Sequence, residues 1–185
     1  MSMILQFVPW IAFALLADVD WRLALAVGVV AQIAVIFVKR PVRVGVLDAA
    51  MIVFFVVVGV YALLDPDASI KAYVDVISTA WLAVVAAGSL IVGHPFTLDF
   101  SRDTVSPEMA ASPRFMAVNR AITGVWAAAF AGMALGGLIS VVTDASWVDT
   151  AAAIVLLVVA IKFTIAYPQQ VRAEAQAQAS SAQAI

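Results

Sequence analysis

The sequence predicts an all-α fold: a polytopic transmembrane helical bundle with six spans, or five if the first apolar run does not cross. Of the 185 residues, 65% are hydrophobic and 12% are charged, and the mean hydropathy is +1.07. Soluble domains carry about 25% charged residues, and a soluble chain of this length would expose much of its apolar surface to water. We therefore expect lipid to surround most of the chain.

Six apolar runs are candidate spans, because the roughly 30 Å core of a bilayer takes about 20 helical residues. They cover residues 3–17, 23–38, 45–64, 72–92, 121–142 and 150–167. The first run is short and contains Pro9, so it is either a full span with its flanks or a shallow re-entrant helix. No basic residue precedes it, which favours a retained span over a cleaved signal peptide. Together the runs predict one integral membrane domain, residues 1–168.

Polar residues punctuate the runs. Asp18 and Asp20 follow the first run, and residues 65–67 (Asp-Pro-Asp) form a turn after the third. We expect Pro168 to end the last span, because proline lacks the backbone N–H that a continuing helix needs. Residues 169–185, rich in Ala and Gln, are then a flexible cytoplasmic tail.

The distribution of Lys and Arg orients the bundle. With six spans, one side holds Lys39, Arg40, Arg43, Arg102, Arg114, Arg120 and Arg172, and the other holds Arg22 and Lys71. Basic loops resist translocation. The first side is therefore expected to be cytoplasmic, with the C-terminus inside.

Three charged residues fall within the apolar runs: Asp48, Asp75 and Lys162. Charges inside a span are costly and mark functional positions by default. In the structural interpretation, Asp48 pairs with Lys162 or Arg43 and pins the bundle. Lys71 and Asp75, four residues apart, would likewise pair on one helix face. The functional alternative is a proton or cation pathway through the intramembrane charges.

Small residues recur every four positions in the fifth run, at Ala128, Gly132, Gly136 and Ser140. Small side chains at this spacing let two helix backbones approach closely, which favours association in lipid. The sequence leaves two partners open for this face. One is another helix of the same chain, and the other is a second copy of the chain in a homodimer.

Residues 93–120 form the one long polar loop between predicted spans. Its candidate partner-binding residues are His94, Asp99, Arg102, Asp103, Arg114, Asn119 and Arg120. A short surface helix here would pair Arg102 with Asp99. The spacing of His94 and Asp99 is also similar to that in membrane glycerolipid acyltransferases, in which a histidine base is oriented by an aspartate. Those enzymes have a large catalytic domain for which this chain has no room.

The residue types present exclude several kinds of chemistry. The chain has no cysteine and one histidine, which excludes disulfides, thiolate chemistry and multi-histidine metal sites. No phosphate loop, zincin motif, nucleotide fingerprint or serine-hydrolase elbow is present. We therefore expect no catalytic residues, no cofactor, no metal and no enzymatic activity. The net charge of −2 does not suggest a nucleic-acid partner.

One family resembles this layout. Phe7, Pro9 and Phe13 match the Phe-x-Pro-x-x-x-Phe start of bacterial intracellular septation protein A. Residues 126–130 (Trp-Ala-Ala-Ala-Phe) and the closing Tyr-Pro at 167–168 are also similar to that family. The loop departs from it, since its Pro-Phe-Thr-Leu stretch looks closer to uncharacterised small bacterial membrane proteins.

The resemblance implies a non-enzymatic, multi-pass protein of the bacterial cytoplasmic (inner) membrane, associated with the cell envelope and septation. Its expected partners are the lipid bilayer, a second copy of the chain, and membrane proteins of the envelope or division machinery. We expect it to act through helix packing and cytoplasmic-loop contacts. The alternative is a small ion- or proton-coupled transporter or channel that uses Asp48, Asp75 and Lys162.

Overall fold

Five long apolar helices make up most of this computed structural model, which describes residues 4–17, 19–38, 44–65 and 69–183. They are α2 (Trp21–Val38), α3 (Val46–Leu64), α4 (Val74–Ile91), α7 (Pro113–Thr143) and α8 (Ser146–Gln183). All five are long and apolar enough to cross a membrane. The predicted all-helical, polytopic membrane fold is confirmed.

A shorter apolar helix, α1 (Ile4–Ala17), precedes these five. Its 14 residues correspond to about 21 Å at ~1.5 Å per residue, less than the ~30 Å of a bilayer core. Pro9 lies inside it, beyond the first turn, so one i→i−4 hydrogen bond of the helix is absent there. Whether residues 3–17 cross the bilayer stays a prediction.

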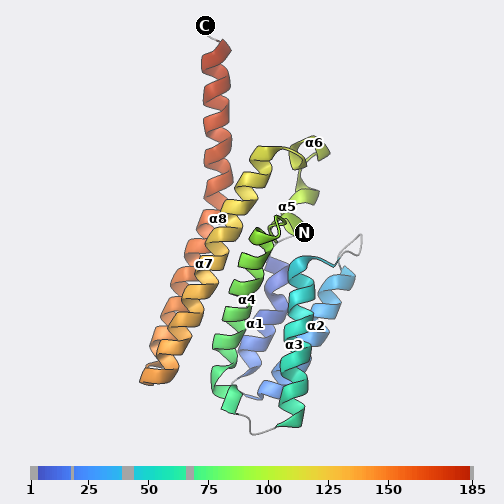
Figure 1. Cartoon of the computed structure of the whole chain (residues 1–185), viewed down its shortest axis with the longest axis vertical. Helices are drawn as coiled ribbons and strands as arrows, with labels where there is room; N and C mark the ends of the chain where they lie inside the picture. The colour runs from blue at the N-terminus through green and yellow to red at the C-terminus, as the bar shows by residue number, and fades with distance from the viewer. Residues whose placement is uncertain (1–3, 18, 39–43, 66–68, 184–185) are drawn as a thin grey trace.

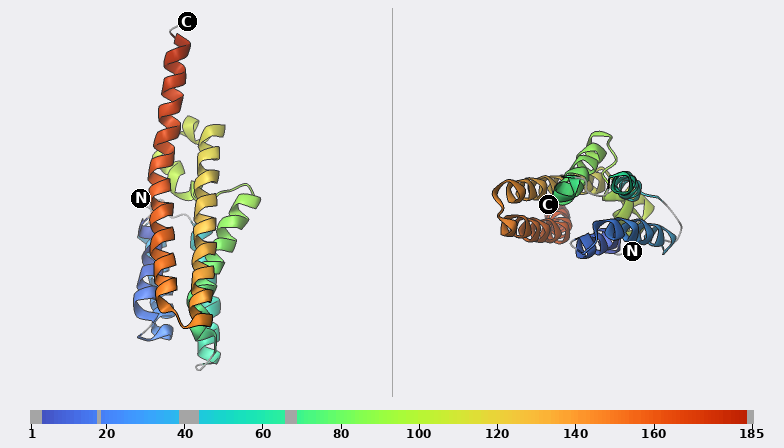
Figure 2. Two further views of the ribbon diagram at one scale, coloured as in Figure 1. Left: turned by 90° about the vertical axis from the view of Figure 1, so that its left-hand side faces the viewer. Right: turned by 90° about the horizontal axis from the view of Figure 1, so that it is seen from below.

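The long helices stand side by side, and neighbours in the sequence are neighbours in space (Figure 1). Seen along the helix axes, α7 and α8 lie at one side of the bundle and α1 and α2 at the other, while α4 lies next to α7, and α3 lies beside α4 and across from α1 and α2 (Figure 2). Phe7 of α1 stacks on Trp126 of α7 with ring centroids 5.4 Å apart. The first helix of the chain, α1, and the penultimate helix, α7, therefore meet inside the bundle.

The two ends of the bundle differ in charge. One end holds the turns that join α1 to α2, α3 to α4 and α7 to α8, with the acidic residues Asp20, Asp65 and Asp144. The other holds the start of α1, the polar segment between α4 and α7, and the protruding part of α8. We call this second end the basic end, after Arg102, Arg114, Arg120 and Arg172.

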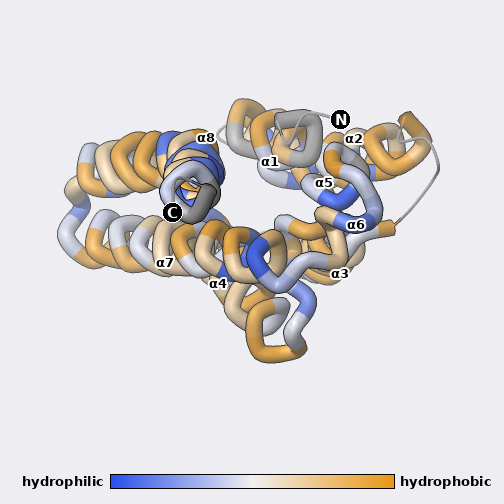
Figure 3. The backbone as a smooth tube through the Cα atoms, turned by 90° about the horizontal axis from the view of Figure 1, so that it is seen from above, coloured by the Kyte–Doolittle hydropathy of each residue, from blue (hydrophilic) through white to orange (hydrophobic). Residues whose placement is uncertain are grey.

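An aromatic cluster forms the core between α1 and α3. Trp10 and Phe13 of α1 lie against Phe54 and Phe55 of α3, with ring centroids 4.9–6.4 Å apart. In contrast, large apolar side chains cover the outside of every long helix, among them Phe37, Val57, Val84, Leu135 and Val155. Such a surface is stable in lipid and not in water, and the apolar colouring runs around the bundle (Figure 3).

The polar segment between α4 and α7 is mostly helical and shorter than predicted. It contains α5 (Leu98–Ser101), the 3-10 turn η2 (Arg102–Thr104) and α6 (Pro107–Ala110). Residues 113–120, predicted as loop, belong to α7, which starts at Pro113 with Ser112 as its N-cap. Proline in the first helical turn and serine before it are strong start signals. We call residues 93–112 the polar cap. A further 3-10 turn, η1 (Ser69–Tyr73), leads into α4.

Pro168 does not end the last helix, contrary to the prediction. Helix α8 continues through it to Gln183, so most of the predicted tail is helical. Proline removes one helical hydrogen bond, but residues 169–183 are mainly Ala, Gln, Glu and Arg, which have high helix propensity. Extending a helix that has already formed avoids the cost of nucleation. The flexibility of the tail stays a prediction.

Candidate functional site: the basic end of the bundle

Asp48 is fully buried in the first turn of α3. Its Oδ2 accepts a hydrogen bond from the backbone N–H of Gly45 at 2.8 Å. Its Oδ1 accepts one from Nε2 of Gln32, on α2, also at 2.8 Å. A carboxylate at a helix start satisfies free backbone amides and lies at the positive end of the helix dipole. Asp48 therefore starts α3 and ties it to α2.

The predicted pairing of Asp48 with Lys162 is not formed. Lys162 lies on the exposed surface of α8, and α8 runs along α7, away from α3 (Figure 3). Arg43, the other predicted partner, lies outside the described residues. The bond to Gln32 joins α2 and α3, and the predicted pairing of Asp48 with Arg43 stays a prediction.

Asp75 occupies the first turn of α4 at the opposite end of the bundle, where it is exposed. Its backbone carbonyl accepts hydrogen bonds from the hydroxyls of Ser78 and Thr79, at 2.8 and 2.9 Å. The side chain of Lys71, its predicted partner, lies outside the described residues. The three intramembrane charges thus occupy three separate places: a buried helix start, an exposed helix start and a lipid-facing surface.

Asp99, in α5, reaches back to the start of α3. Its Oδ2 accepts a hydrogen bond from the backbone N–H of Val46 at 2.8 Å, and its Oδ1 lies 3.2 Å from Nε2 of His94. A Cβ atom on Gly45 would lie 2.6 Å from Asp99 Oδ2, so only glycine permits this approach. Asp99 therefore caps α3 and contacts His94, and it does not form the predicted pair with Arg102, which is exposed.

A second hydrogen-bonded group ties the polar cap to α7. The Oγ1 of Thr97 donates to the carbonyl oxygen of Asn119 at 3.1 Å and lies 2.9 Å from Oγ1 of Thr123. Asn119 Oδ1 accepts from the Ser101 hydroxyl at 2.8 Å, and its Nδ2 donates to the carbonyl of Phe115 at 2.9 Å. Thr97, Asn119 and Thr123 are buried. These polar groups fix the cap in place, because buried groups left unpaired are costly.

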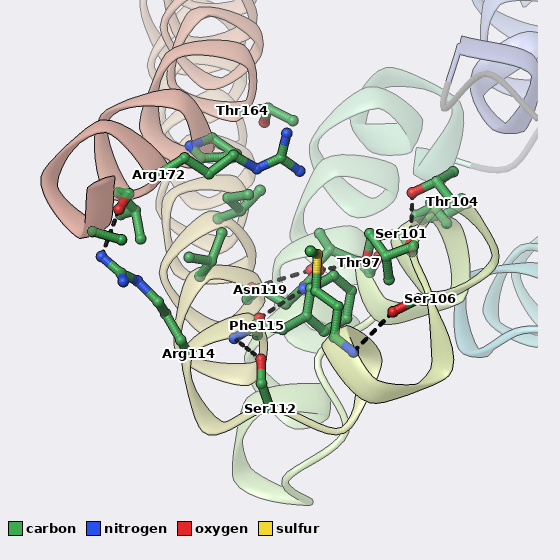
Figure 4. A pocket seen from close by; sticks show the side chains of 18 of the residues that line it. Thr97, Ser101, Thr104, Ser106, Ser112, Arg114, Phe115, Asn119, Thr164 and Arg172 are labelled. Atoms are coloured by element: carbon green, nitrogen blue, oxygen red, sulfur yellow. Dashed lines mark hydrogen bonds between the residues drawn. The ribbon is translucent and has the colours of Figure 1, made fainter. Parts of the chain in front are cut away.

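A pocket of about 1260 Å³ lies between the polar cap, the start of α7 and the segment of α8 around Pro168. Figure 4 shows Arg172 extending from α8 into this space, opposite Thr97, Ser101 and Asn119. Arg114, at the start of α7, donates to the backbone carbonyl of Val171 and so links α7 to the protruding part of α8. His94 and Asp99 do not line this pocket.

Glu108 of α6 is the acidic residue in the pocket lining. A hydrogen bond from its own backbone N–H, followed by one from the Ser106 side chain, holds the pKa of Glu108 below its ordinary value. The carboxylate is therefore charged at neutral pH. With Arg114 and Arg172 on the other side, the charges of the lining sum to about +1.

The small residues of α7 pack against α8 of the same chain. A Cβ atom on Gly132 would lie 2.7 Å from Leu156 Cδ1, and one on Gly136 would lie 2.6 Å from Ala152 Cβ. Gly132 and Gly136, the two central residues of the predicted packing face, thus contact another helix of the same chain. Ala128 is exposed and Ser140 only half-buried, because each four-residue step rotates about 40° around the helix and carries the ends of the stripe out of the contact.

The predicted partner loop divides into two groups. His94, Asp99 and Asn119 hold the cap together, whereas Arg102, Arg114 and Arg120 are exposed at the basic end. The side chain of Asp103 lies outside the described residues. Sequence reasoning missed Thr97 and Thr123, whose only signal is polarity next to an apolar run. It also missed Arg172 as a site residue, because it lies in the segment predicted to be a flexible tail.

The described residues bring no three metal-ligating side chains together. A scan against protein-family models matches no family, and neither curated proteins nor solved structures give a match. The resemblance to intracellular septation protein A therefore stays a prediction. The chain is a polytopic integral membrane protein.

Proposed function

We propose that this protein is a non-enzymatic membrane scaffold that binds its partners at the basic end. The observation that carries the proposal is the contrast between the interior of the bundle and its basic end. Several polar side chains within the bundle are hydrogen-bonded to a neighbouring helix, while the basic end offers exposed arginines and a protruding helix. We expect those partners to be membrane proteins of the cell envelope or division machinery.

Several interior polar groups serve to join helices. Trp81 Nε1 of α4 donates to the carbonyl of Ala50 on α3 at 2.9 Å, and Trp126 Nε1 of α7 donates to Thr164 Oγ1 on α8 at 3.0 Å. The Gln32–Asp48 bond does the same for α2 and α3. Groups that hold helices together in this way are not available to coordinate a moving ion, which favours a scaffold over a transporter.

The protruding part of α8 supplies a contact surface at the basic end. Within residues 169–183, Val171, Arg172, Ala175 and Gln176 line the pocket beside α7 and the polar cap, and the residues after them extend past the bundle (Figure 1). The excess of basic residues at this end supports a cytoplasmic location in a bacterial inner membrane, with the C-terminus inside. Septation is the process that the resemblance implies for such contacts.

A transporter that uses Asp48, Asp75 and Lys162 is the alternative. It needs these charges on one continuous path, and the described residues hold them at three separate places. Proteoliposomes loaded with a pH- or cation-sensitive dye distinguish the two functions. We expect wild type and Asp48→Asn to leak no faster than protein-free vesicles, and flux in wild type that Asp48→Asn abolishes would overturn the scaffold proposal.

Crosslinking in cells tests the contact surface directly. A photoreactive residue at Glu174, exposed on the protruding part of α8, is compared with one at Trp147, exposed at the opposite end. We expect adducts of defined mass from position 174 and none of the same mass from position 147. Equal adduct patterns at the two positions would reject the basic end as the contact site.

A further inference from the structure

The pocket at the basic end has an apolar wall. Phe100, Phe115, Val118 and Ile122 contribute it from the polar cap and α7, facing Val171 on α8. A water-soluble ion needs no such surface, because apolar side chains offer it nothing in place of its hydration shell. The wall fits a ligand with a hydrocarbon part.

Two cations stand at the same pocket. Arg172 points into it from α8, and Arg114 is held at the rim by its bond to the Val171 carbonyl (Figure 4). A guanidinium has five N–H donors and stays charged, so Arg114 keeps donors beyond the one that it uses. Paired donors of this kind match the oxygen atoms of a phosphate group.

The hydroxyl of Ser112 lies on the same lining. Its oxygen caps α7 by accepting from the backbone N–H of Phe115 at 3.2 Å. Accepting that bond leaves the hydroxyl proton free to donate to a ligand oxygen. The pocket thus combines the Arg172 guanidinium, a second cation at its rim and a hydroxyl donor with an apolar wall.

The position of the pocket in the bundle indicates the class of its ligand. Helix α8 packs along α7, and only 6% of its apolar window is buried, against 44% for α3. Its other faces therefore contact the bilayer, and the pocket lies where the apolar part of α8 ends near Pro168. Basic pockets between transmembrane helices are known to bind the headgroups of anionic lipids.

We propose that this pocket binds a membrane phospholipid, with its phosphate held by Arg172 and the first part of an acyl chain on the wall formed by Phe115, Val118 and Ile122. The volume of about 1260 Å³ exceeds that of most small-ligand sites, at ~300–1,000 Å³. Glu108, the anion of the lining, disfavours headgroups that carry more than one negative charge. This inference is independent of the protein contacts proposed above, since it needs only the membrane-spanning fold.

Native mass spectrometry of the full chain in detergent, titrated with phosphatidylglycerol, tests the proposal. Arg172→Gln is compared with Arg120→Gln, a matched change at an exposed arginine of the same end that lies outside the pocket lining. We expect the first to weaken lipid binding by about tenfold, as for the loss of a charge-assisted contact, and the second to leave it unchanged. Equal binding by the two variants overturns the site.

Two further arms identify the ligand and the apolar wall. Soluble glycerol phosphate should compete at least a hundredfold less well than the lipid, and equal competition would assign the pocket to a free phosphate ester. Ala175→Trp fills the pocket from α8, and Ala173→Trp places the same ring on an exposed position outside the lining. We expect only the first to displace lipid, and equal lipid binding by both would place the lipid elsewhere.

Discussion

The carboxylate of Asp99 accepts a hydrogen bond from the backbone N–H of Val46 at 2.8 Å, across a separation of 53 residues. Val46 is the first residue of α3, and Asp48, two residues later, accepts from Gly45. Two carboxylates from different parts of the chain thus satisfy consecutive amides at one helix start. The polar cap is in this way part of the fold of α3 and does not merely connect α4 to α7.

Replacing Asp99 tests this cap. We expect Asp99→Ala to lower the free energy of unfolding by about 1–2 kcal/mol, the usual value of a helix cap. Hydrogen exchange should accelerate at the Val46 amide. Glu108→Gln, which changes an exposed carboxylate of the same segment, serves as control. An unchanged exchange rate at Val46 in Asp99→Ala would contradict the capping role.

Replacing Asp48 by asparagine should destabilise the protein much less than replacing it by alanine. Asparagine keeps an oxygen for one of the two donors, and Gln32 Oε1, which is buried without a hydrogen-bond partner among the described residues, can accept from the new amide. Alanine leaves the Gly45 N–H and the Gln32 amide unpaired. We expect Asp48→Ala to be less stable than Asp48→Asn by about 1–3 kcal/mol, measured by unfolding in detergent. Equal stabilities would argue against the hydrogen bonds described here.

Replacing Gly124 and Gly136 of α7 by alanine should change the stability of the protein in opposite directions. At Gly136 the new Cβ would meet Ala152 Cβ at 2.6 Å, whereas at Gly124 nothing lies within 4 Å. We expect Gly124→Ala to stabilise by about 0.5–1 kcal/mol through helix propensity, and Gly136→Ala to destabilise by about 1–3 kcal/mol through overpacking. Light scattering should show no change in the number of copies per particle, because this contact lies within one chain. Dissociation of a dimer by Gly136→Ala would restore the homodimer interpretation.

The Trp126–Thr164 hydrogen bond should contribute measurably to the α7–α8 contact. Thr164→Val keeps the shape of the side chain and removes the acceptor of the Trp126 indole N–H, which is 3.0 Å away. We expect a loss of about 0.6–1.7 kcal/mol, the range found for hydrogen bonds between membrane helices. The control is Thr150→Val, at an exposed position of the same helix. If both variants unfold at the same denaturant concentration, the bond contributes nothing.

Composition and the lengths of the apolar runs were sufficient to predict the helices, because a lipid solvent selects continuous apolar segments and little else. The start of α7 at Pro113 was missed, since the polar residues of its first two turns resemble a loop. The continuation of α8 beyond Pro168 was missed because proline was expected to end the helix. A single proline is outweighed there by a run of strong helix formers.

The site was only partly visible in the sequence. Asp48 and Asp99 stand out as charges in apolar or mixed surroundings, but their contacts include a backbone amide each, besides Gln32 for Asp48 and His94 for Asp99. No residue pattern encodes a contact between Val46 and a side chain 53 residues later. Likewise, the place of Arg172 depends on α8 staying helical, which brings a residue of the supposed tail beside the start of α7.

The contact surface of α8 has a consequence for how its sequence can change during evolution. Ala152, Leu156 and Thr164 meet α7, Ala160 is fully buried, and these four residues are spaced four apart. The exposed apolar positions of the same stretch, among them Ile154, Val155, Val158, Val159, Ile161 and Ile165, need only stay apolar. Homologous chains should therefore exchange Leu, Ile, Val and Phe freely at those positions, while the residues aligned with 152, 156, 160 and 164 keep their size.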